Sequence, residues 1–175
     1  MWPRRAASWR LGVNPGPCPL LPRAWAPATL RRVRIVVADN YEAMSESAAD
    51  WVADQIRRRP GLLLCAATGS SPKRAYELLA AKRIKEPNLC DRLRVLKLDE
   101  WGGLAMDNPA SGEAYVRRLL VQPLGLSEDR YFAFQSNPDD PPAECARIRA
   151  VLEKEGPIDV CVLGLGANGH LALNE

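Results

Sequence analysis

Three short segments of this chain carry side chains that could do chemistry together. Residues 68–72 (TGSSP) combine hydroxyls with a glycine and a proline, and Asp99 and Glu100 place two carboxylates side by side. His170 is the only histidine among the 175 residues, and Asn174 and Glu175 follow it closely. Each segment comes directly after an apolar run that predicts a buried strand. Because the carboxyl ends of parallel strands meet at one edge of a sheet, we expect the three segments to share one rim.

The segment at 68–72 has the features of an anion-binding helix start. Gly69 allows a ligand to approach the backbone, Ser71 fits the N-cap and Pro72 fits the first helical position. Hydroxyls and free N–H groups at the positive end of a helix would bind a phosphate. The alternative is a well-capped helix whose hydroxyls bond only to backbone. The pattern GxxxxGK[ST] is absent, which excludes a nucleotide P-loop.

The other two segments offer acid–base chemistry. A carboxylate at a strand end, such as Asp99, can be desolvated by its neighbours and act as a base toward a carbon acid. The alternative for Asp99 and Glu100 is a solvated acidic turn. Glu175 stands five residues beyond His170 and could orient its imidazole, although a lone histidine is also a common structural residue. Taken together, the three segments describe a site for proton transfer on a small phosphorylated substrate.

Residues 164–169 match the pattern GxGxxG, which follows a strand in dinucleotide-binding folds. The match lies in the last predicted strand and loop, and no acidic residue stands about 20 positions further on. We therefore expect this loop to present His170 to a ligand rather than to bind a dinucleotide.

The elements that must position these segments alternate between apolar runs, typical of strands, and amphipathic stretches, typical of helices. Strands are expected at 33–38, 62–67, 94–98, 131–134 and 158–165, and helices at 41–59, 72–82, 112–121 and 142–155. The buried stripe of the first helix is expected to be Met44, Ala48, Trp51, Val52 and Ile56. This order predicts an α/β fold, a three-layer αβα sandwich with a mostly parallel, Rossmann-like sheet covered on both faces.

Composition excludes several classes of protein. Hydrophobic residues make up 47% and charged residues 26%, which excludes global disorder, and no apolar run is long enough for a membrane span. The net charge of +3 is unevenly distributed along the chain, because residues 1–38 carry +7 and the remainder carries −4. The body of the chain therefore gives no sign of a nucleic-acid partner.

The cysteines form no CxxC pair, and they are odd in number: Cys18, Cys65, Cys90, Cys145 and Cys161. Cys65 and Cys161 lie inside predicted strands. We expect buried thiols in a reducing compartment such as the cytoplasm, rather than disulfides or zinc ligands.

The chain divides into two regions of different composition. Residues 1–32 are rich in Pro and Arg and are expected to form a disordered extension, whether a transit segment, an upstream extension or the result of a wrongly chosen start codon. Residues 33–175 are expected to form the folded domain. Because this domain ends a few residues past its last predicted strand, we expect it to be C-terminally truncated, and inactive or poorly folded by itself.

The chain resembles the glucosamine-6-phosphate deaminase/isomerase family, particularly its galactosamine-6-phosphate branch. The resemblance covers residues 33–175 and rests on ATGSSPKRAYELL, on KLDEWGGL with NPASGEAY downstream, and on VLGLGANGHLALNE. The related 6-phosphogluconolactonases share the fold, but LDEWGGL and the final NE fit the amino-sugar enzymes better. The resemblance implies conversion of a hexosamine 6-phosphate to a ketohexose 6-phosphate and ammonia, without a metal or redox cofactor.

The resemblance also implies a role for each site residue. Asp99 would move the proton between C2 and C1, His170 would assist ring opening, and Glu175 would be the carboxylate paired with it. Asn168 stands where the hexosamine deaminases commonly have Asp; an amide can bond to the imidazole but cannot stabilise its cation by charge, and the sugar epimer stays open. The phosphate ligands would be Thr68, Gly69, Ser70 and Ser71. The family's basic phosphate ligands would lie beyond the last residue.

Two other functions and the oligomeric state are left open. A sugar-phosphate lactonase would hydrolyse a 6-phosphogluconolactone and release no ammonia. A non-catalytic sugar-phosphate sensor would need the phosphate cradle but not Asp99, His170 or Glu175. Such sensors normally carry a helix-turn-helix segment, and residues 1–32 show no such pattern. The expected partner is a small sugar phosphate, with a homo-oligomer as a further option.

Overall fold

The computed structural model describes residues 33–172, which fall into two units, 33–36 and 37–172. Residues 33–36 are extended, expose the side chains of Val33, Ile35 and Val36, and belong to none of the described strands. The strand predicted at 33–38 is therefore wrong. An apolar run has the composition of a strand, but it becomes one only where a neighbouring strand takes up its N–H and C=O groups.

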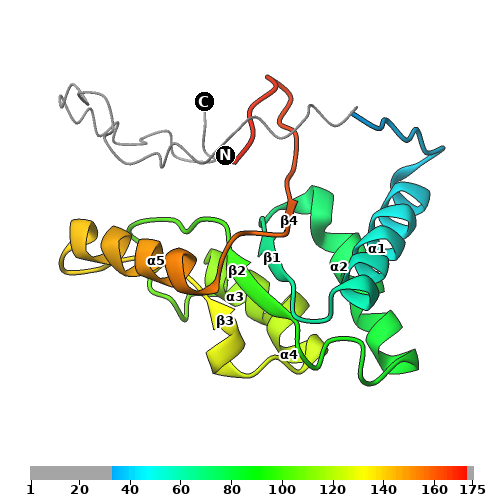
Figure 1. The fold of residues 1–175 in the computed structure, drawn as a ribbon. Coiled ribbons are helices and arrows are strands. Elements are labelled where there is room, and N and C mark those ends of the chain that lie inside the picture. Colours follow the sequence, from blue (N-terminus) through cyan, green and yellow to red (C-terminus); the bar gives the residue numbers. More distant parts are fainter. Residues whose placement is uncertain (1–32, 173–175) are drawn as a thin grey trace. The chain divides into compact units, whose positions relative to one another are not determined.

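A parallel sheet runs through the unit 37–172 (Figure 1). Its order is β3-β2-β1-β4, where β1 is Leu63–Ala66, β2 is Arg94–Lys97, β3 is Tyr131–Phe132 and β4 is Val160–Val162. All three neighbouring pairs are parallel, so the carboxyl ends of these strands lie at one edge. The prediction of a parallel sheet is confirmed, with each of these four strands shorter than its apolar run.

Helices fill the segments between the strands, and polar side chains start three of them. In each case the side-chain oxygen accepts a hydrogen bond from the N–H three residues further on: Asn40 from Ala43, Ser111 from Ala114 and Asp140 from Ala143. The helices are α1 Tyr41–Arg58, α2 Ser70–Lys85, α3 Gly112–Val116, α4 Gln122–Leu124 and α5 Pro141–Glu155, with a π-helical turn at Arg117–Val121 and a 3₁₀ turn at Glu128–Arg130. Within residues 33–172, no helix has the length and apolar character that a bilayer span requires.

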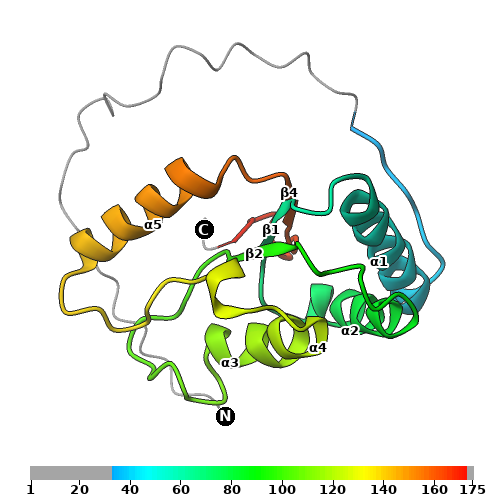
Figure 2. The same cartoon turned by 60° about the horizontal axis from the view of Figure 1, so that its bottom comes forward.

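The sheet is covered on both faces, as the sequence predicts. In Figure 2 the strands lie between α5 on one side and α2, α3 and α4 on the other. The larger core packs α1, α2 and the α3–α4 segment against side chains such as Leu64 and Val95. A smaller cluster on the opposite face joins Leu63, Cys65 and Leu96 to Leu152 of α5. The three-layer αβα arrangement is therefore present in this unit.

The buried face of α1 differs from the predicted stripe. Val52 and Ile56 are buried as expected, whereas Met44 and Trp51 are 42% and 51% exposed, and Ala48 is exposed. The helix instead buries small side chains, Ser45, Ala49 and Ala53, at four-residue spacing. Small residues let α1 lie close to α2, against which it packs. The predicted stripe of larger apolar residues is wrong because close packing between helices, and not hydrophobicity alone, determines which face of the helix is buried.

A wide helical turn interrupts the helix predicted at 112–121. The Gln122 N–H donates to the Arg117 carbonyl oxygen five residues back, instead of to the oxygen four residues back. Leu119, Leu120 and Val121 are all buried along this turn. The wider spacing lets three successive apolar side chains face the core.

The revised face of α1 can be tested by truncating one buried and one exposed side chain. Ile56 is fully buried, so Ile56→Ala is expected to lower the free energy of unfolding by about 2–5 kcal/mol. Trp51→Ala removes a larger side chain at an exposed position and is expected to change it by about 0.5 kcal/mol or less. Urea denaturation of both variants measures these changes. A larger loss for Trp51→Ala than for Ile56→Ala would contradict this arrangement.

Candidate functional site

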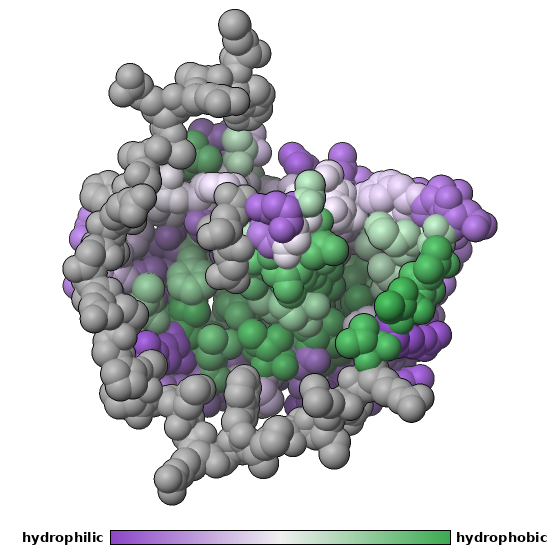
Figure 3. Space-filling view, turned by 90° about the horizontal axis from the view of Figure 1, so that it is seen from above, coloured by the Kyte–Doolittle hydropathy of each residue, from purple (hydrophilic) through white to green (hydrophobic). Residues whose placement is uncertain are grey.

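The loops that follow β1, β2 and β4 surround a pocket of about 650 Å³. That volume is typical of pockets for small molecules. The pocket is lined by Ala67–Pro72, Leu98, Asp99, Trp101, Ala110–Gly112, Tyr115, Gly164–Gly166, His170 and Ala172. Figure 3 views the unit from above, where hydrophobic residues gather in the middle and hydrophilic ones lie toward the edge. The structure thus brings together the three segments that the sequence places at one rim.

The loop after β1 opens directly into α2. Gly69 is the N-cap of α2 and has φ +117°, a backbone conformation that disfavours any side chain. The prediction of Ser71 as N-cap is wrong, because the helix already begins at Ser70 and Ser71 is its second residue. Gly69 supplies no side-chain cap. The N–H groups of the first turn, which have no partner within a helix, are therefore left for a ligand or for water.

Tyrosine hydroxyls hold this loop through its carbonyl oxygens. Tyr115 donates to the Gly69 oxygen at 2.6 Å, Tyr41 donates to the Ser70 oxygen at 2.6 Å, and Tyr76 donates to the Ala67 oxygen at 3.0 Å. Within residues 33–172, the hydroxyls of Ser70 and Ser71 make no hydrogen bond, and both residues are exposed. The alternative, a capped helix whose hydroxyls bond only to backbone, is therefore wrong for Ser70 and Ser71. The three tyrosines were missed in the sequence.

Asp99 lies at the carboxyl end of β2 and lines the pocket half-buried. Burial raises the pKa of its carboxyl group, and the negative charge of Glu100 raises it further, against a smaller opposing effect of Lys97. A carboxylate with a raised pKa takes up a proton more readily than one in water. Asp99 is therefore suited to accept a proton from a bound molecule.

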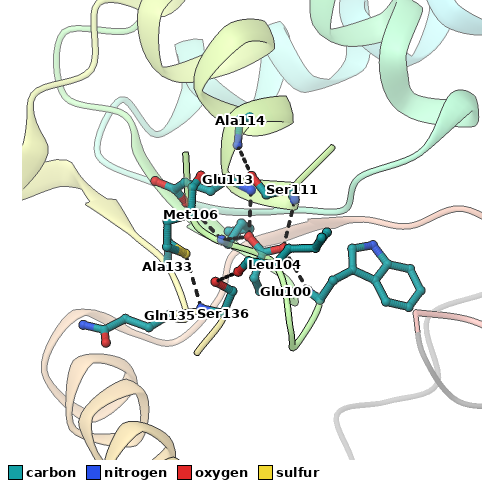
Figure 4. A network of polar contacts seen from close by, with 12 residues as sticks. Glu100, Leu104, Met106, Ser111, Glu113, Ala114, Ala133, Gln135 and Ser136 are labelled. Carbon is teal, nitrogen blue, oxygen red and sulfur yellow. Dashed lines mark hydrogen bonds and ion pairs between the residues drawn. The ribbon is translucent and has the colours of Figure 1, made fainter. Parts of the chain in front are cut away.

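Glu100 is a structural residue and points away from solvent, with a side chain only 1% exposed. Its two oxygens accept hydrogen bonds from the N–H groups of Trp101, Gly112 and Glu113, at 2.7–2.8 Å. Figure 4 shows Glu100 below the first turn of α3, which these bonds attach to the loop after β2. Burial alone would raise the pKa of Glu100, but Lys97 and the backbone donors outweigh burial and lower it. For Glu100, the alternative of a solvated acidic turn is excluded.

Lys97 is fully buried and neutralises two carboxylates. Its ammonium group lies 2.5 Å from Glu100 and 2.9 Å from Glu113. Glu113 also accepts hydrogen bonds from the Tyr131 hydroxyl at 2.8 Å and from Arg117 at 2.7 Å. Sequence analysis did not select Lys97. The signal was a charged residue inside the apolar run VLKL, where an unpaired charge would be very costly.

The rest of the loop between β2 and α3 is held by serine and asparagine side chains (Figure 4). Ser111 donates to the Met106 oxygen at 3.0 Å, and Ser136 donates to the Leu104 oxygen. Asn137 also donates to Leu104, at 2.9 Å. Trp101 extends from this loop into the pocket lining with a largely exposed ring. The loop is thus fixed at several points while Trp101 remains available to a ligand.

His170 reaches the pocket from the loop after β4. The Asn168 Oδ1 lies 2.5 Å from His170 Nδ1 and accepts from the His170 N–H at 3.2 Å, so the amide orients the ring. The Gly166 N–H donates to the His170 carbonyl oxygen at 2.9 Å and closes the loop. A Cβ at Gly166 would lie 2.3 Å from the imidazole, so the ring uses space that only glycine leaves. Glu175, the expected partner of His170, lies outside the described residues.

Comparison with known proteins assigns the family. The family described as "Glucosamine-6-phosphate isomerases/6-phosphogluconolactonase" matches residues 38–172. The chain belongs to this family. The sequence resemblance to the glucosamine-6-phosphate deaminase/isomerase family is therefore confirmed, whereas its galactosamine-6-phosphate branch stays a prediction.

Two curated members of the family show how far the likeness extends. The chain is 37% identical over 164 residues to a putative deaminase, AgaI, from Escherichia coli K12, covering 94% of this chain and 63% of that protein. It is 32% identical over 143 residues to glucosamine-6-phosphate deaminase 1 of Bacillus subtilis 168, covering 82% of this chain and 59% of that protein. The chain therefore spans about three-fifths of the length of these relatives.

Solved structures of the same family support the fold. A monomeric glucosamine-6-phosphate deaminase matches with a TM-score of 0.72 and 33% identity, over 77% of this chain and 56% of that one. A 6-phosphogluconolactonase from Shewanella baltica matches with a TM-score of 0.62 and 23% identity, over 78% and 58%. The second likeness concerns the fold alone.

The close approach of Gly166 to His170 gives a direct test of the site's geometry. Gly166→Ala is expected to displace the imidazole while the fold persists, because a side chain can move where backbone cannot. His170 is the only histidine, so its imidazole signals in NMR spectra of the folded chain report on this ring alone. Gly102→Ala is the control, because its Cβ would make only an ordinary contact at 3.8 Å. Unchanged imidazole signals in Gly166→Ala would contradict the described loop.

The raised pKa of Asp99 predicts a stability gain when its charge is removed. The folded chain holds this proton more tightly than the unfolded chain, so the carboxyl group costs stability once pH exceeds its ordinary pKa of about 3.9. Asp99→Asn is therefore expected to melt at a higher temperature than the parent at about pH 7, with the difference shrinking toward about pH 3. Exposed Asp107, replaced by Asn, is the control. A lower melting temperature for Asp99→Asn at neutral pH would show that the carboxylate is stabilising.

Proposed function

We propose that this pocket binds a hexosamine 6-phosphate and converts it, with water, to a ketohexose 6-phosphate and ammonia. The observation that carries the proposal is that Asp99 and His170 line the same pocket onto which the start of α2 opens. A proton acceptor, an oriented imidazole and anion-binding N–H groups are the functions that this reaction needs. The relatives named as glucosamine-6-phosphate deaminases support the choice of substrate.

The phosphate group would bind at the start of α2. Its first-turn N–H groups and the exposed hydroxyls of Ser70 and Ser71 face no described protein acceptor, and the helix dipole favours an anion there. Thr68 and Gly69 line the same part of the pocket. These donors are neutral and therefore give weaker hydrogen bonds than charged ones. We expect them to orient the phosphate more than to supply most of its binding energy.

Proton transfer would be divided between Asp99 and His170. His170 would assist opening of the sugar ring by helping the anomeric hydroxyl proton reach the ring oxygen. Asp99 would then take the proton from C2 and return it to C1, which moves the carbonyl character from C1 to C2. Water would replace the nitrogen at C2, and ammonia would leave. The raised pKa of Asp99 matches an acceptor that must also give the proton back.

Asn168 would keep the imidazole of His170 in position without adding a negative charge. The neutral amide suits a step in which the imidazole passes a proton on and does not stay protonated. Glucosamine and galactosamine 6-phosphate differ only in the configuration at C4, so both are candidates. The assay below decides between them.

A matched pair of variants tests this function. Asp99→Asn is expected to reduce ammonia release by about 100-fold or more, because it removes the proton acceptor, while sugar phosphate still binds. Asp107→Asn alters an exposed carboxylate outside the pocket and is expected to leave both properties unchanged. Ammonia release from glucosamine and galactosamine 6-phosphate measures turnover, and calorimetric titration with each sugar measures binding.

The outcomes separate the candidate functions. Hydrolysis of 6-phosphogluconolactone without ammonia from either amino sugar would support the lactonase instead. Binding of sugar phosphate that is equal in the parent and Asp99→Asn, with no turnover of any of the three substrates, would fit both the non-catalytic sensor and the expectation that this chain is inactive by itself. Absence of binding by all these sugar phosphates would refute the proposed pocket function altogether.

A further inference from the structure

Two cysteines lie directly opposite each other on neighbouring strands. Cys65 of β1 is in register with Cys161 of β4 in a parallel pair. Neighbouring strands are about 4.8 Å apart, which falls inside the range of about 4.4–6.8 Å that Cα atoms joined by a disulfide span. The strand spacing therefore already satisfies the main geometric requirement for a disulfide.

Both side chains lie on the same face of the sheet. Cys65 belongs to the smaller cluster beneath α5, whereas Val160, next to Cys161 in the strand, packs into the larger core on the opposite face. Because side chains alternate along a strand, Cys161 points to the face that holds Cys65. Burial raises the pKa of the Cys65 thiol, and the neighbouring Cys161 raises it further.

The two thiols differ sharply in their access to solvent. Cys65 is 1% exposed, whereas Cys161 is exposed. The expectation of buried thiols is therefore confirmed for Cys65 and wrong for Cys161. A small oxidant can therefore reach Cys161 but not Cys65. This pairing of an accessible thiol with a protected one is the arrangement in which one cysteine is oxidised first and the other then resolves it.

We propose that Cys65 and Cys161 form an oxidation site that closes a disulfide between β1 and β4 in the presence of a hydroperoxide. The Cys161 sulfur attacks the peroxide, whose O–O bond breaks to release water or an alcohol and leave a sulfenic acid. The Cys65 sulfur then attacks the Cys161 sulfur. The S–O bond breaks, the S–S bond forms, and the Cys65 proton leaves with the hydroxyl group as water. Two thiols lose two electrons in total, and the hydroperoxide gains them.

The disulfide would connect two loops of the pocket. Cys65 stands three residues before Thr68, and Cys161 stands three residues before Gly164, and both of these residues line the pocket. Gly164 already lies near Ser71, since a Cβ on it would be 3.8 Å from the Ser71 side chain. Oxidation would thus fix the loop that carries His170 against the start of α2.

The other described cysteines provide matched controls. Cys90 is buried like Cys65, and burial raises the pKa of its thiol to about 11, but it lies outside the strands. Cys145 is exposed like Cys161 and lies on α5. Each therefore matches one member of the pair in exposure without its cross-strand neighbour.

The experiment treats the full chain with hydrogen peroxide and then counts free thiols after denaturation and alkylation. The number is expected to fall from five to three, with a mass loss of two hydrogens and a crosslinked peptide pair containing Cys65 and Cys161. A dithiol reductant should restore all five. Cys161→Ser, a change at an exposed position, is expected to abolish the crosslink, whereas Cys90→Ser and Cys145→Ser should leave it in place.

Three results would overturn the proposal. These are oxidation of Cys161 only to its sulfinic or sulfonic acid, a crosslink that joins two copies of the chain, and a crosslink that persists in Cys161→Ser. The readout is chemical and requires no turnover, so it stands or falls independently of the proposed deaminase function.

Discussion

The buried charge of Lys97 is the constraint on which the arrangement of the site depends. Its ammonium group sits between Glu100 and Glu113, and none of the three side chains has appreciable access to water. Removing one partner of such a buried group costs about 3–5 kcal/mol, because the remaining charges lose their compensation. The strand β2, the loop after it and the start of α3 are therefore held together by one cluster. Asp99 stands between Lys97 and Glu100 in the sequence, so the contacts of these two residues fix its position.

The same cluster sets the electrostatics of the pocket. Glu100 is held ionised by Lys97 and by three backbone N–H groups, and its negative charge helps keep the pKa of Asp99 high. The start of α2 lines the same pocket and presents the positive end of a helix. The pocket thus combines a carboxyl group of raised pKa with the positive end of a helix. A substrate with a phosphate at one end and an acidic C–H at the other would meet both.

Sequence reasoning succeeded where one residue's environment follows from its immediate neighbours. Near-continuous apolar runs predicted the parallel sheet, and the shared direction of parallel strands then placed Ser70, Asp99 and His170 at one rim. It failed where the environment is set by another part of the chain. The close packing of α1 on α2 exposes Trp51, the early start of α2 removes Ser71 from the N-cap, and the run at 33–38 finds no partner strand among the described residues. Lys97 was missed because its two partners, Glu100 and Glu113, become neighbours only after folding.

The wide turn at Arg117–Val121 has a consequence for how mutations along this segment are tolerated. It takes up one residue more than an α-helical turn would use, so the helical faces of α3 and α4 stay in phase across it. Winding the same residues as a regular α-helix would rotate α3 by about 100° relative to α4. Glu113 would then turn away from Lys97, and Tyr115 would turn away from Gly69. Substitutions that enforce regular winding in this turn would therefore break both contacts at once.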